Sequence, residues 1–250
     1  MPETTRRPTT PWRIWDLDLE LRYGPVVEAL RRIDDSICEI GAGLVGLARW
    51  VPNQIVGVDP TPAPDEAVLP SNLELVTASG NAIPLADRSV GAAVAVDTFE
   101  HVAPELRAPI LAEMKRVTRD DGLVIVMGPT GRESEQADRR LLRMFERKNV
   151  GESSARWLRE HIANGLPTVE ELTTGLGTDR VRSVTARGVF NIRLWYLMHL
   201  AASGAIPRTG PLHPSVWYPV AAIARRFHLT PCYRQLVVAS IGAKLDVNRG

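Results

Sequence analysis

Short apolar runs recur along the first half of the chain, separated by polar turns and by stretches with helical periodicity. Each run has the length and apolar content of a strand covered on both faces. The runs occupy residues 37–40, 55–58, 73–77, 90–96 and 123–127. After the fourth run, Pro104 opens a segment whose apolar residues recur every three or four positions, which predicts a long helix. Strands that alternate with helices predict a parallel, doubly wound α/β sheet.

The second half of the chain has a different pattern. Residues 133–161 are charged and helical in period, and Thr168 followed by Glu171 predicts a capped helix start. Residues 180–187 and 233–241 read as two late strands, with helical segments at 190–202 and 216–227 between them. We therefore expect a Rossmann-like, seven-stranded sheet. It is mostly parallel, its last strand is antiparallel, and a helical insertion separates strands six and seven over the carboxyl edge.

The same pattern divides the chain into regions. Residues 1–11 are rich in threonine and proline and are predicted to be a disordered tail. Tyr23-Gly24-Pro25 predicts a break before an amphipathic helix at 26–33. Residues 12–189 and 231–246 then form the Rossmann-like domain, and residues 190–230 form the insertion, either a substrate lid or a dimer contact.

The strand at 37–40 runs directly into a G-x-G-x-x-G turn. Gly41 allows a backbone conformation that a Cβ would penalise, Gly43 lets a ligand approach the main chain, and Gly46 lets the following helix pack closely on the strand. Asp59 ends the next strand, 13 residues after Gly46, where its oxygens can accept both hydroxyls of a ribose. The combination predicts a nucleoside-binding site, which a glycine turn alone would not.

The composition and net charge of the chain limit the kinds of partner that it is expected to bind. The 250 residues carry 30 basic and 29 acidic side chains, a formal net charge of +1, which argues against nucleic acid as the main partner. Cys38 and Cys232 stand far apart without metal or disulfide spacing, so we expect a reducing, cytoplasmic location. The N-terminus lacks the apolar run of a signal peptide, and the most apolar late segment, 194–206, is too short to span a membrane.

Four stretches together resemble the class I S-adenosylmethionine-dependent methyltransferases, over residues 36–130. They are ICEIGAGLVG, VGVDP, ASGNAIPLADRSVGAAVAVDTFEHV and LAEMKRVTRDDGLVIVMGP. The resemblance implies S-adenosylmethionine as the cofactor. The residues that it implies for cofactor binding are Glu39, Gly41, Ala42 and Gly43 along the methionine and ribose, Asp59 on the ribose hydroxyls, Gly80, Asn81 and Ala82 beside the adenine, and Asp97, Thr98 and Phe99 at the methionine end.

This chain departs from the resembled family at Asn81, where the family usually has an acid. An acid accepts a hydrogen bond from the adenine amino group, and the Asn81 side-chain carbonyl can still accept one without charge. We therefore expect cofactor binding to survive this change.

Two other functions fit the same glycine turn. An NAD(P)-dependent oxidoreductase also uses G-x-G-x-x-G followed by an acid. Glu39, directly before the glycines, would disfavour a pyrophosphate at the helix N-terminus but not a cationic sulfonium ligand. A non-catalytic relative that binds the nucleoside without turnover is the third possibility.

The residues directly after strand four narrow the choice of acceptor. The stretch Asp97-Thr98-Phe99-Glu100 is not the Asn-Pro-Pro-aromatic motif of amino-methylating nucleic-acid enzymes, which leaves oxygen, an amine or an activated carbon. His101, just past the strand, is the first candidate base, and a helix-capping histidine is its structural alternative. His161 is the rival base, with a solvated helix-surface histidine as its alternative. Some O-methyltransferases use magnesium, so a metal site is an open alternative, but no carboxylate cluster at ligand spacing appears in the sequence and no metal ligand is assigned.

Aromatic residues and arginines gather in the insertion. They are Trp195, Tyr196, Trp217, Tyr218, Arg193, Arg225 and Arg226. Such a mixture suits a hydroxylated or glycosidic acceptor, and equally the core of a subdomain or a homodimer contact. This half weakly resembles actinobacterial sugar and polysaccharide O-methyltransferases. The expected reaction is O-methylation of a small-molecule or glycan acceptor.

Overall fold

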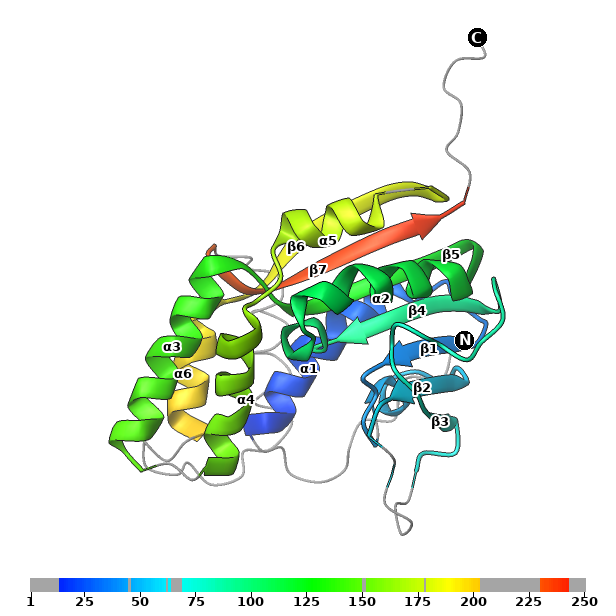
Figure 1. The fold of residues 1–250 in the computed structure, drawn as a ribbon. Coiled ribbons are helices and arrows are strands. Elements are labelled where there is room, and N and C mark those ends of the chain that lie inside the picture. The colour runs from blue at the N-terminus through cyan, green and yellow to red at the C-terminus, as the bar shows by residue number, and fades with distance from the viewer. Residues whose placement is uncertain are drawn as a thin grey trace.

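One seven-stranded sheet forms the centre of the protein (Figure 1). The computed structural model describes residues 14–44, 46–61, 63, 69–149, 152–177, 179–202 and 230–242. The strands are β1 (Ile37–Ile40), β2 (Ile55–Asp59), β3 (Leu73–Thr77), β4 (Val90–Val96), β5 (Thr118–Pro129), β6 (Val181–Asn191) and β7 (Cys232–Ile241). Their order is β3-β2-β1-β4-β5-β7-β6. Neighbours among β1 to β5 pair in parallel, and β7 pairs antiparallel with both β5 and β6, which confirms the predicted fold.

Helices cover both faces of this sheet. They are α1 (Ile14–Ala29), α2 (Pro104–Val117), α3 (Gly131–Arg147), α4 (Glu152–Asn164), α5 (Val169–Leu176) and α6 (Ile192–Ala202), with short 3₁₀ helices η1 (Gly46–Arg49) and η2 (Phe99–His101). Helices α2 and α5 lie on one face, and α1 lies on the other (Figure 1). Helices α3, α4 and α6 group beyond the carboxyl ends of β1 and β4 (Figure 1).

Strand alternation divides the core into two apolar clusters. In β4, Val94 and Val96 belong to the cluster shared with α1, α3, α4 and α6, whereas Ala93 and Ala95 face α2 and α5. Every residue of β4 is buried, as expected for a central parallel strand. This packing fixes the carboxyl edge, where β1, β2 and β4 end beside one another.

Three local predictions were wrong. Helix α1 continues through Tyr23-Gly24-Pro25, because Leu21, Tyr23 and Val26 are buried in the core, and this packing outweighs the weak helix propensity of glycine and proline. Strand β5 starts at Thr118, five residues early, with Asp121 at φ +67° within the strand. The glycine turn leads into the four-residue η1 and not into a full helix.

Other boundaries agree with the sequence. Thr168 and Glu171 form the predicted capping box of α5. A helix, α6, follows β6 and precedes β7, as expected for the insertion. The tail at 1–11 and the helix expected at 216–227, with its aromatic and arginine residues, lie outside the described residues. Within the described part of the chain, no helix is both long and apolar enough to cross a bilayer.

Candidate active site

The glycine turn lies at the carboxyl end of β1. Gly41, Gly43 and Gly46 have φ values of +74°, +55° and +47°, which only glycine adopts without strain. A Cβ on Gly41 would lie 2.7 Å from Thr98 Oγ1, and one on Gly46 would lie 2.2 Å from Glu39 Oε2. A Cβ on Gly43 would meet nothing within 4 Å, so this stretch of main chain is open to a ligand. All three positions therefore require the backbone freedom of glycine, and Gly41 and Gly46 also have no space for a side chain.

Glu39 is buried beneath this turn. Its Oε2 accepts the Leu47 N–H of η1 at 2.6 Å, and its Oε1 accepts the Tyr23 hydroxyl at 3.3 Å. Burial raises the pKa of Glu39 to about 7, and the two hydrogen bonds oppose this rise. The carboxylate therefore occupies the amino end of η1, where a dinucleotide would need to place its pyrophosphate.

The remaining residues expected around the nucleoside gather at the same edge. Asp59, at the end of β2, accepts the Gly43 N–H at 3.2 Å and the Thr61 N–H at 2.9 Å. The side-chain oxygen Oδ1 of Asn81 accepts a hydrogen bond from the Ser79 hydroxyl at 2.5 Å in an exposed loop. Of the other residues expected in this group, Gly80 and Ala42 are buried, and Ala82 is exposed. Asp59 and Asn81 are thus the polar side chains here that can turn toward a ligand.

Thr98 and Phe99 follow β4 and have different surroundings. The Thr98 hydroxyl donates to the Ile40 carbonyl at 3.0 Å or the Val96 carbonyl at 3.2 Å, and so ties the ends of β1 and β4 together. The Phe99 ring is 2% exposed and packs in the cluster under α2. Phe99 can therefore meet a ligand through its backbone only.

Asp97 forms an ion-pair network that the sequence pattern did not predict. Arg234 of β7 binds both carboxylate oxygens of Asp97, with Nη2–Oδ2 at 2.9 Å, and reaches Asp18 Oδ1 of α1 at 3.2 Å. Arg22 adds contacts to Asp18 and to Asp97. Burial alone would raise the pKa of Asp97, and the two guanidinium groups lower it below its ordinary value. In the sequence, these four residues were marked only by being charged residues within or beside apolar stretches.

A cavity of about 170 Å³ opens beside this network, between the sheet edge and α4. Its lining comes from α1, the end of β4, η2, the end of β5, α4, α6 and β7. The lining residues are Arg22, Asp97, Glu100, His101, Pro129, Trp157, His161, His199, Tyr233 and Arg234. The structure thus brings both candidate bases into one cavity, with the ring centroids of His101 and His161 4.9 Å apart.

His161 is buried, at 3% exposed, so the solvated surface position that was its alternative is wrong. Its Nδ1 lies 3.0 Å from Asp138 Oδ2, and the Tyr233 hydroxyl donates to Asp138 Oδ1 at 2.6 Å. Burial raises the pKa of Asp138, and the hydrogen bonds from His161 and Tyr233 oppose this rise. When Asp138 is ionised it can only accept, so the neutral imidazole carries its proton on Nδ1 and keeps its lone pair on Nε2. Asp138 and Tyr233 are positioning residues that no sequence pattern singled out.

His101 is more open, with its side chain 37% exposed, and its Nδ1 lies 3.0 Å from Glu160 Oε2 of α4. Burial and the neighbouring His161 lower the pKa of His101, and Glu160 partly opposes this effect. His199 is buried, and its Nδ1 lies 2.9 Å from the Trp195 carbonyl oxygen. Burial lowers the pKa of His199 to about 4, so it is neutral at physiological pH.

Sheet order, glycine turn and carboxyl-edge cavity agree with the class I methyltransferase domain that the sequence resembles. Residues 38–126 match the family described as Methyltransferase domain, and this span runs from β1 into β5. None of the curated proteins matches the chain.

Solved structures share the fold at low identity. The YcgJ protein from Bacillus subtilis is 13% identical with a TM-score of 0.54, covering 91% of this chain and 100% of that one. A SAM-dependent methyltransferase from Archaeoglobus fulgidus is 14% identical with a TM-score of 0.51, covering 90% and 99%. The 1,6-didemethyltoxoflavin-N1-methyltransferase from Burkholderia thailandensis, solved with S-adenosylhomocysteine, is 12% identical with a TM-score of 0.50, covering 92% and 82%.

The fold, the glycine turn and the family match together support an S-adenosylmethionine-dependent methyltransferase, with S-adenosylmethionine as its cofactor. The residues present fit this cofactor. The open main chain at Gly43 and the acceptors of Asp59 suit its ribose, and the buried Glu39 suits a cationic ligand better than a pyrophosphate.

Proposed function

We propose that this enzyme transfers the methyl group of S-adenosylmethionine to an oxygen of a small or glycosidic hydroxylated acceptor. The observation that carries the proposal is the cavity at the carboxyl edge, in which His101 and His161 lie side by side next to Asp97. Open α/β sheets bind their ligands at this edge, so the acceptor and the methyl group can meet there.

The reaction is an in-line displacement at the methyl carbon. An acceptor oxygen forms a bond to this carbon while the carbon–sulfur bond breaks, which leaves neutral S-adenosylhomocysteine. The enzyme must align the two reactants and receive the hydroxyl proton. His161 is oriented for this task by Asp138, and His101 by Glu160, so that either Nε2 can accept the proton.

Two observations support this function over the alternatives. The Glu39 carboxylate already accepts the Leu47 N–H at the amino end of η1, which disfavours the pyrophosphate of NAD(P). The Asp138–His161 pair, buried beside an accessible His101, supports turnover over nucleoside binding alone. A cytoplasmic location, a glycan acceptor and a homodimer remain predictions.

Titration calorimetry with S-adenosylhomocysteine tests the cofactor assignment. We expect binding by the wild-type protein and no heat with NAD. Asp59→Ala should weaken binding by about 1.5–3 kcal/mol, because a charged acceptor of the ribose hydroxyls is lost. Asp34→Ala is the matched control, since Asp34 is exposed before β1. Equal affinity of Asp59→Ala and Asp34→Ala would show that Asp59 does not hold the ribose.

Incubation with methyl-labelled S-adenosylmethionine and fractionated metabolites and glycans tests the acceptor. We expect label on an oxygen of a small or glycosidic molecule. His101→Gln and His161→Gln should then lower turnover by about 100- to 10,000-fold while S-adenosylhomocysteine affinity stays within about twofold. Label on nucleic acid or on a nitrogen would contradict the O-methylation proposal and leave the cofactor assignment in place.

A further inference from the structure

Three side chains in the cavity converge on one point. Glu100 and His101 come from η2, and His161 comes from α4, 60 residues further along the chain. One ligand atom from each lies within 4.8 Å of the other two. Two imidazoles and one carboxylate form the donor set of many catalytic zinc and non-haem iron sites.

The Glu100 carboxylate gives independent evidence of a missing partner. Glu100 is 1% exposed, and its Oε2 is one of three buried side-chain atoms in the described residues without a hydrogen-bond partner. A buried carboxylate oxygen without a partner carries a substantial desolvation cost. Because Glu100 lines the cavity, this oxygen is placed to bind a ligand there.

The two histidines are already oriented as metal ligands usually are. Asp138 holds His161 Nδ1, and Glu160 holds His101 Nδ1, each at 3.0 Å. A carboxylate on Nδ1 fixes the tautomer and leaves the Nε2 lone pair for a cation, which is the outer-shell arrangement of most histidine metal sites. Each imidazole has its own carboxylate, so the arrangement occurs twice in one cavity.

The two chain segments that carry the three side chains are also fixed to each other. The Arg107 guanidinium, 3% exposed, donates to the carbonyls of Val102 after η2 and of Asn164 and Gly165 at the end of α4. Asn164 Nδ2 donates to the Glu100 carbonyl at 3.4 Å. The separation of η2 and α4 is therefore set by hydrogen bonds that do not involve the three side chains themselves.

We propose that Glu100, His101 and His161 bind a divalent first-row transition metal ion, such as Zn²⁺ or Fe²⁺, at the acceptor end of the cavity. Imidazole nitrogens favour such ions over Mg²⁺, which prefers oxygen ligands. Three protein ligands leave coordination positions open for an acceptor hydroxyl. The role of the ion rests on the proposed function: it would bind the acceptor oxygen and lower the pKa of its hydroxyl, and the proton would then pass to solvent water in place of an imidazole base.

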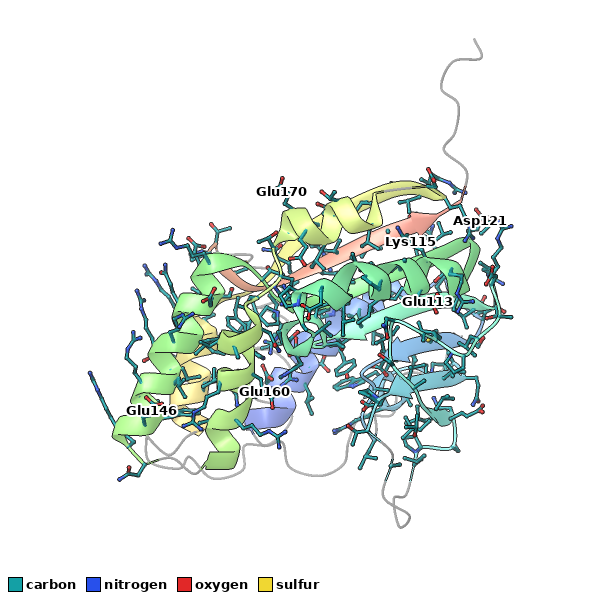
Figure 2. All side chains as sticks on the ribbon, in the orientation of Figure 1. Glu113, Lys115, Asp121, Glu146, Glu160 and Glu170 are labelled. Carbon is teal, nitrogen blue, oxygen red and sulfur yellow. The ribbon has the colours of Figure 1, made fainter. Side chains whose placement is uncertain are left out.

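Cobalt titration tests the site without measuring turnover. Untagged protein, stripped with EDTA, is titrated with Co²⁺, and bound metal is followed by visible ligand-field bands and by equilibrium dialysis. We expect one Co²⁺ per chain, displaced by Zn²⁺ and not by equal Mg²⁺. Glu100→Gln and His161→Gln should weaken binding by at least tenfold to one hundredfold, and Glu160→Gln by about tenfold. Glu170→Gln, on α5 and away from Glu160 on α4, is the matched control (Figure 2).

The outcomes separate this site from the proposed methyl transfer. Absence of stoichiometric Co²⁺ binding, or equal binding by Glu100→Gln, His161→Gln and Glu170→Gln, would overturn the metal site. Circular dichroism establishes that each variant is folded. Calorimetry with S-adenosylhomocysteine on the stripped protein reports cofactor binding separately, so methyltransferase function can stand where the metal site fails. Full turnover after stripping, with Co²⁺ binding retained, would overturn the catalytic role of the ion.

Discussion

The hydrogen bonds and the pKa of an individual side chain in this protein depend on its neighbours in space more than on its position in the sequence. Glu39 lies within a strand, yet its carboxylate caps η1 and accepts the Tyr23 hydroxyl. Burial raises its pKa to about 7 from an ordinary value of 4.5. The protonated form therefore contributes stability that is fully present below pH 4.5 and is lost as the pH rises to about 7.

Glu39→Gln should remove this pH dependence. The amide oxygen can still accept the Leu47 N–H, and no charge forms in the buried site. Between pH 5 and pH 8 the wild-type free energy of unfolding should fall by up to about 3 kcal/mol relative to the variant. Urea unfolding at several pH values measures the difference. Glu74→Gln is the control, because Glu74 is an exposed residue of β3. Parallel profiles for wild type and Glu39→Gln would contradict the burial argument.

At the same scale, the sequence predicted residue types better than their pairings. The glycines and Asp59 could be found because a turn and a strand end lie close together in the chain. Asp138, Tyr233 and Arg234 could not, because each acts on a residue at least 20 positions away. The grouping of Glu100 and His101 with His161 was hidden for the same reason, and ligand spacing along the chain could not show it.

At the scale of elements, local signals were reliable where local energetics decide. The Thr168 hydroxyl accepts the Glu171 N–H at 3.0 Å, and the Glu171 carboxylate accepts the Thr168 N–H at 3.3 Å. Both bonds lie within one turn, so the sequence could predict them. Helix α1 is the opposite case, because the burial of Leu21 and Val26 in the tertiary structure overrides the Gly24-Pro25 signal.

Thr168→Ala should therefore weaken the start of α5. Loss of the cap leaves the Glu171 N–H without its side-chain partner and should lower the free energy of unfolding by about 1 kcal/mol. Thr174→Ala, on the exposed side of the same helix, should change it by less than about 0.5 kcal/mol. Chemical denaturation of both variants measures the contrast, and an equal effect at the two threonines would rule out a capping contribution.

At the scale of the whole molecule, Arg234 joins three distant parts of the chain. It connects β7 to Asp18 on α1 and to Asp97 after β4, and its side chain is 4% exposed. The order of the sheet could be predicted from the alternation of strands and helices, because topology follows simple packing rules. The two buried ion pairs that Arg234 forms, with Asp18 and with Asp97, follow from no such rule.

Arg234→Ala should be strongly destabilising. Removing the guanidinium leaves two buried carboxylates with Arg22 as their remaining partner in this network, at an expected cost of about 3–5 kcal/mol. Arg139→Ala is the control, since its i,i+4 pair with Glu135 lies on the surface and should contribute less than about 0.5 kcal/mol. Guanidinium unfolding of the two variants tests this, and a loss below about 1 kcal/mol at Arg234 would contradict it.

The position of β7 between β5 and β6 also bears on how the chain folds during synthesis. β6 has β7 as its pairing partner, and β5 needs β7 to cover its second edge. Until residues 232–241 leave the ribosome, a nascent chain has an open sheet edge, and Asp18 and Asp97 lack Arg234. Completion of the cavity therefore waits for the synthesis of β7, and a ribosome that stalls before β7 leaves a chain with β6 unpaired and the cavity unfinished.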